Sequence, residues 1–124
     1  MEFVKLILDK SYGDYSSQNA SNLEMCILGN FLTSDVYHPS SYIEYALNEW
    51  EEYTSSNVTA LAKENGYILL MDLYSEERVP TALKMIRKQF IQILTDWEEK
   101  VCKKKPKEVI IKYEDEQFII ETKD

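Results

Sequence analysis

The chain is poor in the residues that build linkers, disulfide frameworks and metal clusters. It has three glycines, three prolines, two cysteines and a single histidine in 124 residues. So few glycines and prolines exclude collagen-like and linker-rich chains, and 44% hydrophobic residues exclude a wholly disordered one. Cys26 and Cys102 form neither a CxxC pair nor a zinc-ligand spacing. We therefore expect no metal and no cofactor.

Long apolar runs are also missing. None approaches the roughly 18 residues needed to cross a bilayer, and the N-terminus carries no apolar signal segment. The two cysteines are therefore interpreted as reduced thiols of a cytoplasmic protein. The length predicts one domain covering residues 1–124.

Catalytic motifs are absent as well. His38 is the only histidine, so a Ser-His-Asp or Cys-His arrangement would have to use it, yet no GxSxG elbow or glycine-flanked cysteine accompanies it. Lysines beside Cys102 could lower the pKa of its thiol, but helix packing is the simpler role. The sequence predicts no catalytic residue and no enzyme. An enzyme that uses His38 or a carboxylate pair is the least favoured alternative.

Positive charge is missing from one long segment. Between Ser11 and Ala62 there is no Lys or Arg, although the segment holds seven carboxylates, and the whole chain carries a net charge of −8. Nucleic-acid binding needs Lys and Arg to replace counterions, so this half of the chain argues against it. The acidity favours a cationic partner, or it serves only solubility.

Aromatic residues are interleaved with these carboxylates. Tyr and Trp anchor protein interfaces, and negative charge around such anchors speeds encounter with a basic protein. We therefore predict a partner-binding surface made of Asp14, Tyr15, Asp35, Tyr37, Glu44, Glu49, Trp50, Glu51, Glu52 and Tyr53. Some of the rings could equally lie in the core, because Tyr42 and Trp50 share an apolar helical face.

Strands are predicted near both ends of the chain. Residues 2–9 are rich in apolar residues on both faces, which indicates an inner or helix-covered strand. Asn65-Gly66 lies between two apolar runs in residues 58–73 and predicts a hairpin with a type I′ turn. Residues 108–113 and 117–122 predict a second hairpin, with a loop of about three residues. Residues 11–22 are interpreted as a polar loop.

The dominant helical pattern covers residues 79–102. Its apolar residues recur at steps of three and four, Pro80 suits a first helical turn, and Pro106 forbids continuation. A second amphipathic segment runs from Tyr42 to Trp50, with Ser40 or Ser41 as N-cap. Residues 23–32 suit a helix or a strand, and Ser21 with Glu24, arranged as in a capping box, favours the helix.

The elements do not alternate as strand and helix, and no Gly-rich loop follows a strand, which excludes a doubly wound nucleotide fold. We predict an α+β fold. It has a mostly antiparallel sheet of about five strands, with the long helix packed on one face and one or two shorter helices.

Three stretches carry a resemblance to a known class. PSSYIEYAL (residues 39–47), NGYILLMDLYSEE (65–77) and the C-terminal LTDWEEKVCKKKPKEVIIKYEDEQFIIETKD (94–124) resemble bacterial immunity proteins, in particular those of contact-dependent growth inhibition systems. The resemblance implies a cytoplasmic inhibitor that binds a cognate toxin, often a nuclease with a basic cleft, and has no chemistry of its own. It transfers no individual functional residue.

The leading hypothesis is thus an immunity protein that neutralises a toxin through an acidic, aromatic-rich surface, without binding nucleic acid or membrane itself. The alternative is a non-catalytic regulatory or structural module that binds another protein or forms a homodimer through the aromatic patch. An exposed hairpin edge could also pair with a second chain, so the sequence does not fix the oligomeric state.

Overall fold

The computed structural model describes residues 2–49, 52–78 and 80–124. The strands are β1 (Glu2–Asp9), β2 (Asp14–Ala20), β3 (Tyr53–Ser55), β4 (Thr59–Glu64), β5 (Tyr67–Asp72), β6 (Ala82–Ile86), β7 (Glu108–Glu114) and β8 (Gln117–Lys123). The helices are α1 (Leu23–Asn30), α2 (Pro39–Leu47) and α3 (Arg87–Trp97). Two π-helical turns, η1 (Phe31–Asp35) and η2 (Glu98–Cys102), continue α1 and α3.

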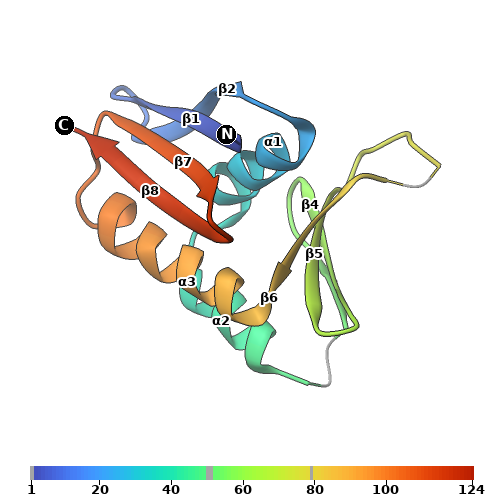
Figure 1. The fold of residues 1–124 in the computed structure, drawn as a ribbon. Coiled ribbons are helices and arrows are strands. Elements are labelled where there is room, and N and C mark those ends of the chain that lie inside the picture. Colours follow the sequence, from blue (N-terminus) through green and yellow to red (C-terminus); the bar gives the residue numbers. More distant parts are fainter. Residues whose placement is uncertain (1, 50–51, 79) are drawn as a thin grey trace.

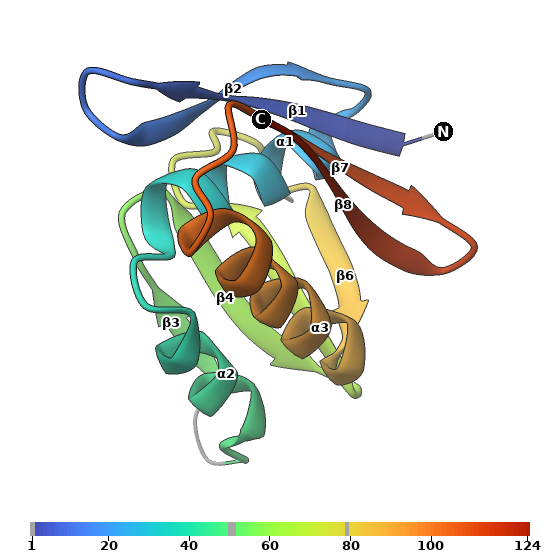
Figure 2. The same ribbon diagram turned by 90° about the vertical axis from the view of Figure 1, so that its left-hand side faces the viewer.

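The strands form two antiparallel four-stranded sheets instead of the single sheet of about five strands that we predicted. Sheet A has the order β2-β1-β7-β8, and sheet B has the order β3-β4-β5-β6. Helices α1 and α3 lie between the two sheets, and α2 packs beside α3 (Figures 1 and 2). The α+β class, the antiparallel pairing and the two shorter helices are confirmed.

The core fills the space between the two sheets. Val4 and Leu6 of β1 point into it from sheet A, while Leu61 and Leu70 point into it from sheet B. Between them the rings of Phe31 and Phe90 stack, with centroids 6.0 Å apart. Alternation along each strand leaves the opposite face of each sheet outside this core. The inner position predicted for residues 2–9 is therefore confirmed, whereas none of the helices in the described ranges covers the outer face of β1 (Figure 2).

The N-terminal part of the predicted long helix is a strand. Leu83 and Met85 point into the core from β6, which pairs with β5, and α3 begins only at Arg87. Spacing of three and four had suggested a helix from residue 79, a residue outside the described ones. The alternation of Leu83 and Met85 serves a strand equally well, and the free edge of β5 decides between the two.

Three local predictions are also corrected. Residues 14–20 form the edge strand β2 rather than a loop, because β1 offers them a hydrogen-bonded ladder. Helix α2 begins at Pro39, after His38, so neither Ser40 nor Ser41 is its N-cap, and it ends at Leu47. The helix predicted for residues 23–32 is confirmed, but Asn22 caps it by accepting a hydrogen bond from the Met25 N–H.

Both predicted hairpins are present. Asn65 and Gly66 have φ values of 51° and 83°, as a type I′ turn requires. The β7–β8 hairpin also turns in two residues rather than three, because Glu114 pairs with Gln117 and leaves only Asp115 and Glu116 between them.

Candidate protein-binding site

The structure divides the predicted surface residues into three groups. Tyr15 and Asp35 are buried. Asp14, Tyr37, Glu44, Glu49, Glu52 and Tyr53 are exposed. Trp50 and Glu51 lie outside the described residues.

Asp35 is a structural residue at the end of η1, and 3% of its surface is exposed. Its carboxylate accepts hydrogen bonds from the backbone N–H groups of Val58, at 3.1 Å, and Thr59, at 2.9 Å. These bonds fix the start of β4 against the helical layer. Because both carboxylate oxygens are used inside the protein, we remove Asp35 from the predicted surface.

Tyr15 is likewise an internal residue. Its hydroxyl donates a hydrogen bond to the Pro106 carbonyl at 2.5 Å, and its ring meets the edge of Trp97. Burial, with a smaller contribution from the nearby Cys102, raises the pKa of the Tyr15 hydroxyl to about 12. Burial also raises the pKa of the Cys102 thiol, outweighing the opposite effect of Lys105, so the lysines do not activate this thiol.

A cleft of about 190 Å³ joins the β1–β2 turn to the N-terminal side of α2. Asp14, Tyr15 and Tyr37 all line it, so the fold brings together three of the predicted residues from two segments. Lys105 also lines the cleft and donates a hydrogen bond to the Gly13 carbonyl at 3.2 Å.

Helix α2 presents an exposed stripe that continues from this cleft. Glu44 and Leu47 lie three residues apart on the same side of the helix, and Tyr37 lies two residues before its first residue. The side chains of Tyr37 and Leu47 are 69% and 57% exposed. The opposite side of the helix is anchored in the core, where the ring of Tyr42 meets Phe31 edge-on at 5.0 Å. Together with Glu49 and Glu52, which follow the helix, the exposed stripe forms what we call the α2 surface.

The basic residue Lys63 lies near the end of α2, where its ammonium group already contacts groups of this chain. Lys63 donates a hydrogen bond to the Asn48 carbonyl, and its ammonium group lies 4.1 Å from the centre of the Tyr45 ring. The α2 surface itself is made of two large apolar side chains and three carboxylates, with no basic residue among the described positions 37–52. It can receive a cationic protein surface and bury an apolar centre.

Tyr53 belongs to a different surface. It opens β3, pairs in register with Ala62 and is 59% exposed on the outer side of sheet B. The sequence pattern did not separate it from the residues of α2, since the separation depends on which way β3 faces once it pairs with β4.

The structure shows no assembled catalytic or metal-binding centre in the part of the chain that it describes. His38 is exposed beside the start of α2. Residues 2–49, 52–78 and 80–124 contain no group of three or more His, Cys, Asp and Glu side chains that could hold a metal ion. None of the helices in these ranges is long and apolar enough to cross a membrane.

Comparison with protein-family models, with curated proteins and with solved structures finds no match for this chain. Its surfaces are therefore interpreted from their own geometry and charge.

Proposed function

We propose that the chain is a toxin-neutralising immunity protein that binds the basic surface of a cognate protein toxin, such as a nuclease domain, through the α2 surface. The observation that carries this proposal is the exposed pair Glu44 and Leu47 on a helix anchored in the core, with the exposed ring of Tyr37 two residues before the helix begins. Side chains on a helix held in this way lose little entropy on binding.

In this proposal Tyr37 and Leu47 fill the desolvated centre of the interface. Glu44, Glu49 and Glu52 form a negative rim that takes the place of nucleic-acid phosphates on the toxin. Charge of opposite sign on the two partners accelerates their encounter, and salt screens that acceleration. The inhibitor needs no catalytic residue for this, because occupying the basic surface is sufficient.

The test is co-expression with the toxin domain encoded directly upstream of this chain in its genome. The unmodified chain should restore growth and co-purify with the toxin. Replacing Glu44 and Glu49 by Lys should weaken binding by about 100-fold or more, since like charges then face each other. The double variant of Glu76 and Glu114 to Lys makes the same change in net charge on exposed sites elsewhere, and it should retain binding.

Equal loss in both charge variants would show that only net charge matters, and the α2 surface would then be rejected as the binding site. Failure of the unmodified chain to bind or protect would reject the immunity function. Measured association rates should also fall steeply between low and high salt, as expected for a charge-steered pair.

A further inference from the structure

The C-terminal end of α2 is held by a lysine from sheet B. Lys63 lies on β4, on the same side of the strand as the core residue Leu61, so its side chain points toward the helices. Its ammonium group donates a hydrogen bond to the carbonyl of Asn48, the residue that follows the last turn of α2. The same ammonium group lies 4.1 Å from the centre of the Tyr45 ring. A cation is favoured here, because the helix dipole places negative charge at the C-terminal carbonyls and the ring face attracts a cation.

A second set of contacts fixes the chain beyond the helix. The backbone N–H of Lys63 donates a hydrogen bond to the Glu52 carbonyl at 2.8 Å, and the Tyr45 hydroxyl donates one to the same carbonyl at 3.3 Å. Tyr45 belongs to the core, so its ring is a fixed support. Lys63 and Tyr45 therefore hold the backbone at Asn48, directly before Glu49, and at Glu52 itself. Glu49 and Glu52 are two of the three carboxylates of the α2 surface.

The charge of Lys63 is a disadvantage for a surface that needs only negative charge. Lys63 is the first basic residue after residues 11–62, which contain none. A cation near the end of α2 lowers the negative potential that would attract a basic partner. The contacts of its ammonium group and backbone N–H show a different use, because both bind groups next to the carboxylates of the α2 surface.

We propose that Lys63 is a positioning residue of the α2 surface, which holds Glu49 and Glu52 in the arrangement that the cationic partner meets. This inference rests on the proposed function and deepens it. Carboxylates on a backbone that is already ordered lose less conformational entropy on binding than carboxylates on a mobile one. Lys63 acts through these two glutamates and does not need to touch the partner.

Lys63→Met separates positioning from charge, with the upstream toxin domain as the probe and its dissociation constant as the readout. The variant keeps the apolar stem but removes one cation, so charge alone would make binding to a basic toxin faster and tighter. Positioning predicts the opposite: the dissociation constant should rise by about ten-fold, because Glu49 and Glu52 must then be ordered on binding.

Two control variants accompany Lys63→Met. Lys123→Met removes one cation from the exposed end of β8 in sheet A, and it should bind the toxin at least as tightly as the unmodified chain. Lys63→Arg keeps a cation and a hydrogen-bond donor at the Tyr45 ring, and it should retain binding. Urea denaturation followed by circular dichroism confirms that each variant is folded.

Coupling to the carboxylates separates positioning from a general structural role. Replacing Glu49 and Glu52 by Gln should weaken toxin binding strongly in the unmodified chain and clearly less in the Lys63→Met chain, where these carboxylates are no longer held. Tyr45→Phe removes the hydrogen bond to the Glu52 carbonyl without a change in net charge, and it should weaken binding by about two- to five-fold. Equal losses from the two Gln substitutions in both chains would overturn the proposal.

A measurement on the free chain makes the test independent of the toxin. Backbone amide relaxation measured by NMR should show lower order at Glu49 and Glu52 in Lys63→Met than in the unmodified chain. Unchanged order there, or a Lys63→Met variant that binds the toxin as tightly as Lys123→Met, would overturn the positioning role and leave the immunity function intact. An unmodified chain that does not bind the toxin would reject the proposed function, and the relaxation data alone would then decide whether Lys63 holds Glu49 and Glu52.

Discussion

The two sheets of this protein have the same number of strands and the same antiparallel pairing, but their contacts with the helices and the composition of their outer faces differ. Sheet A contacts the helical layer through Gly29, where an added Cβ would lie 2.9 Å from a methyl group of Val4, and through the buried ring of Tyr15. Sheet B is joined to the same layer by a carboxylate, that of Asp35. On the outside, sheet A carries ion pairs, whereas sheet B carries alanines and tyrosines.

The difference shows that strand pairing and burial decide which residues face the core, but leave the composition of each outer face open. Charges interleaved with apolar residues make an outer face compatible with water. The following predictions test this comparison, beginning with the largest expected effect.

Removing the carboxylate that holds sheet B should be the most damaging change. Asp35→Ala leaves the backbone N–H groups of Val58 and Thr59 without their acceptor in a buried site, and it should lower the free energy of unfolding by about 3 kcal/mol. Urea denaturation followed by circular dichroism measures this loss. Asp35→Asn keeps one acceptor oxygen and should lose clearly less. Equal stability of Asp35→Ala and the unmodified chain would contradict this account of sheet B.

The free energy of unfolding should fall at alkaline pH, because of a tyrosine in sheet A. The pKa of Tyr15 is raised to about 12, so above pH 10 the unfolded chain loses this proton while the folded chain retains it. Stability is therefore complete below pH 10 and falls as pH rises toward 12, by about 2–3 kcal/mol in total.

Urea denaturation at several pH values measures this slope. Tyr15→Phe should remove most of the loss between pH 10 and 12, at the expense of the hydrogen bond to Pro106 at neutral pH. Tyr42→Phe is the matched control, since burial raises the pKa of Tyr42 as well, and it should remove a smaller part. An unchanged slope in Tyr15→Phe would rule Tyr15 out as its source.

Substitutions in the two hairpin turns should change the stability of the protein in opposite directions. Gly66 in sheet B has φ = 83°, so Gly66→Ala should destabilise the protein by about 1 kcal/mol. In sheet A the equivalent turn position is Glu116, with φ = 62°, and Glu116→Gly should stabilise by about 0.5–1 kcal/mol because the left-handed conformation no longer strains a side chain.

The Glu116 carbonyl, which accepts a hydrogen bond from Gln89, is kept in the Glu116→Gly variant. Thermal unfolding of the two single variants measures both effects. A destabilising Glu116→Gly would indicate that the Glu116 side chain makes a contribution that outweighs its backbone strain.

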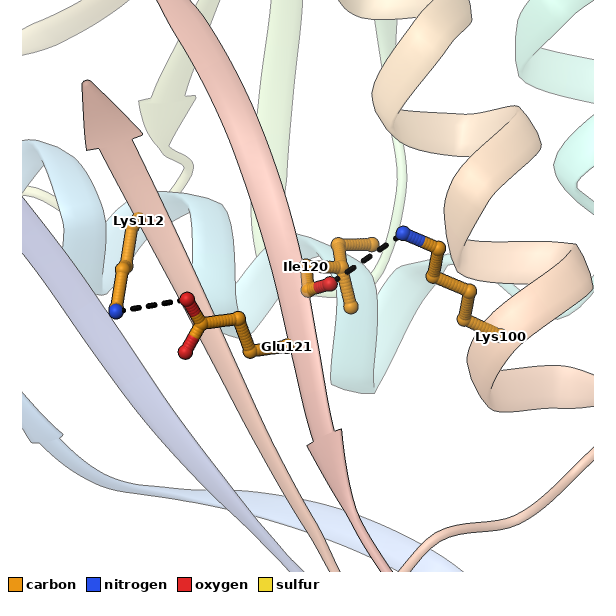
Figure 3. Close-up of polar contacts among 4 residues, drawn as sticks. All are labelled: Lys100, Lys112, Ile120 and Glu121. Atoms are coloured by element: carbon orange, nitrogen blue, oxygen red, sulfur yellow. Dashed lines mark hydrogen bonds and ion pairs between the residues drawn. The ribbon is translucent and has the colours of Figure 1, made fainter.

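The ion pairs of sheet A should matter least for stability. Lys112 and Glu121, which form one of these ion pairs (Figure 3), are both partly exposed, so Lys112→Met should leave the free energy of unfolding nearly unchanged. The difference from the unmodified chain should shrink in high salt. Sedimentation of the Lys112→Met variant also shows whether removing a charge from the outer face of sheet A makes that face associate. A large loss of stability would assign the pair a structural role.

Features that depend on neighbouring residues could be predicted from the sequence. The Asn65-Gly66 hairpin is one, because positive φ at two successive positions is a property of those two residues. The helix from Leu23 is another, although its cap moved by one residue to Asn22. The acidic, aromatic composition of the α2 surface was also visible in the sequence.

Features that depend on distant partners could not be predicted. The segment DYSSQNA has little strand propensity, and β1 makes it a strand by pairing with it. The burial of Asp35 depends on two amide groups that lie 23 and 24 residues further along the chain. The apolar outer positions of sheet B were not recognised in the sequence because Ala60, Ala62 and Ala82 have no marked pattern until three strands place them side by side.

The amino-acid sequence by itself therefore determined the secondary structure of the segments with strong local signals, the net charge of −8 and the absence of Lys and Arg from residues 11–62. Only the tertiary structure decided that there are two sheets, that Leu83 and Met85 belong to a strand, and which polar residues are internal. The physical reason is that turns and amphipathic helices are encoded within a few residues. Strand pairing and burial, in contrast, depend on which edges and amides remain free in the rest of the fold.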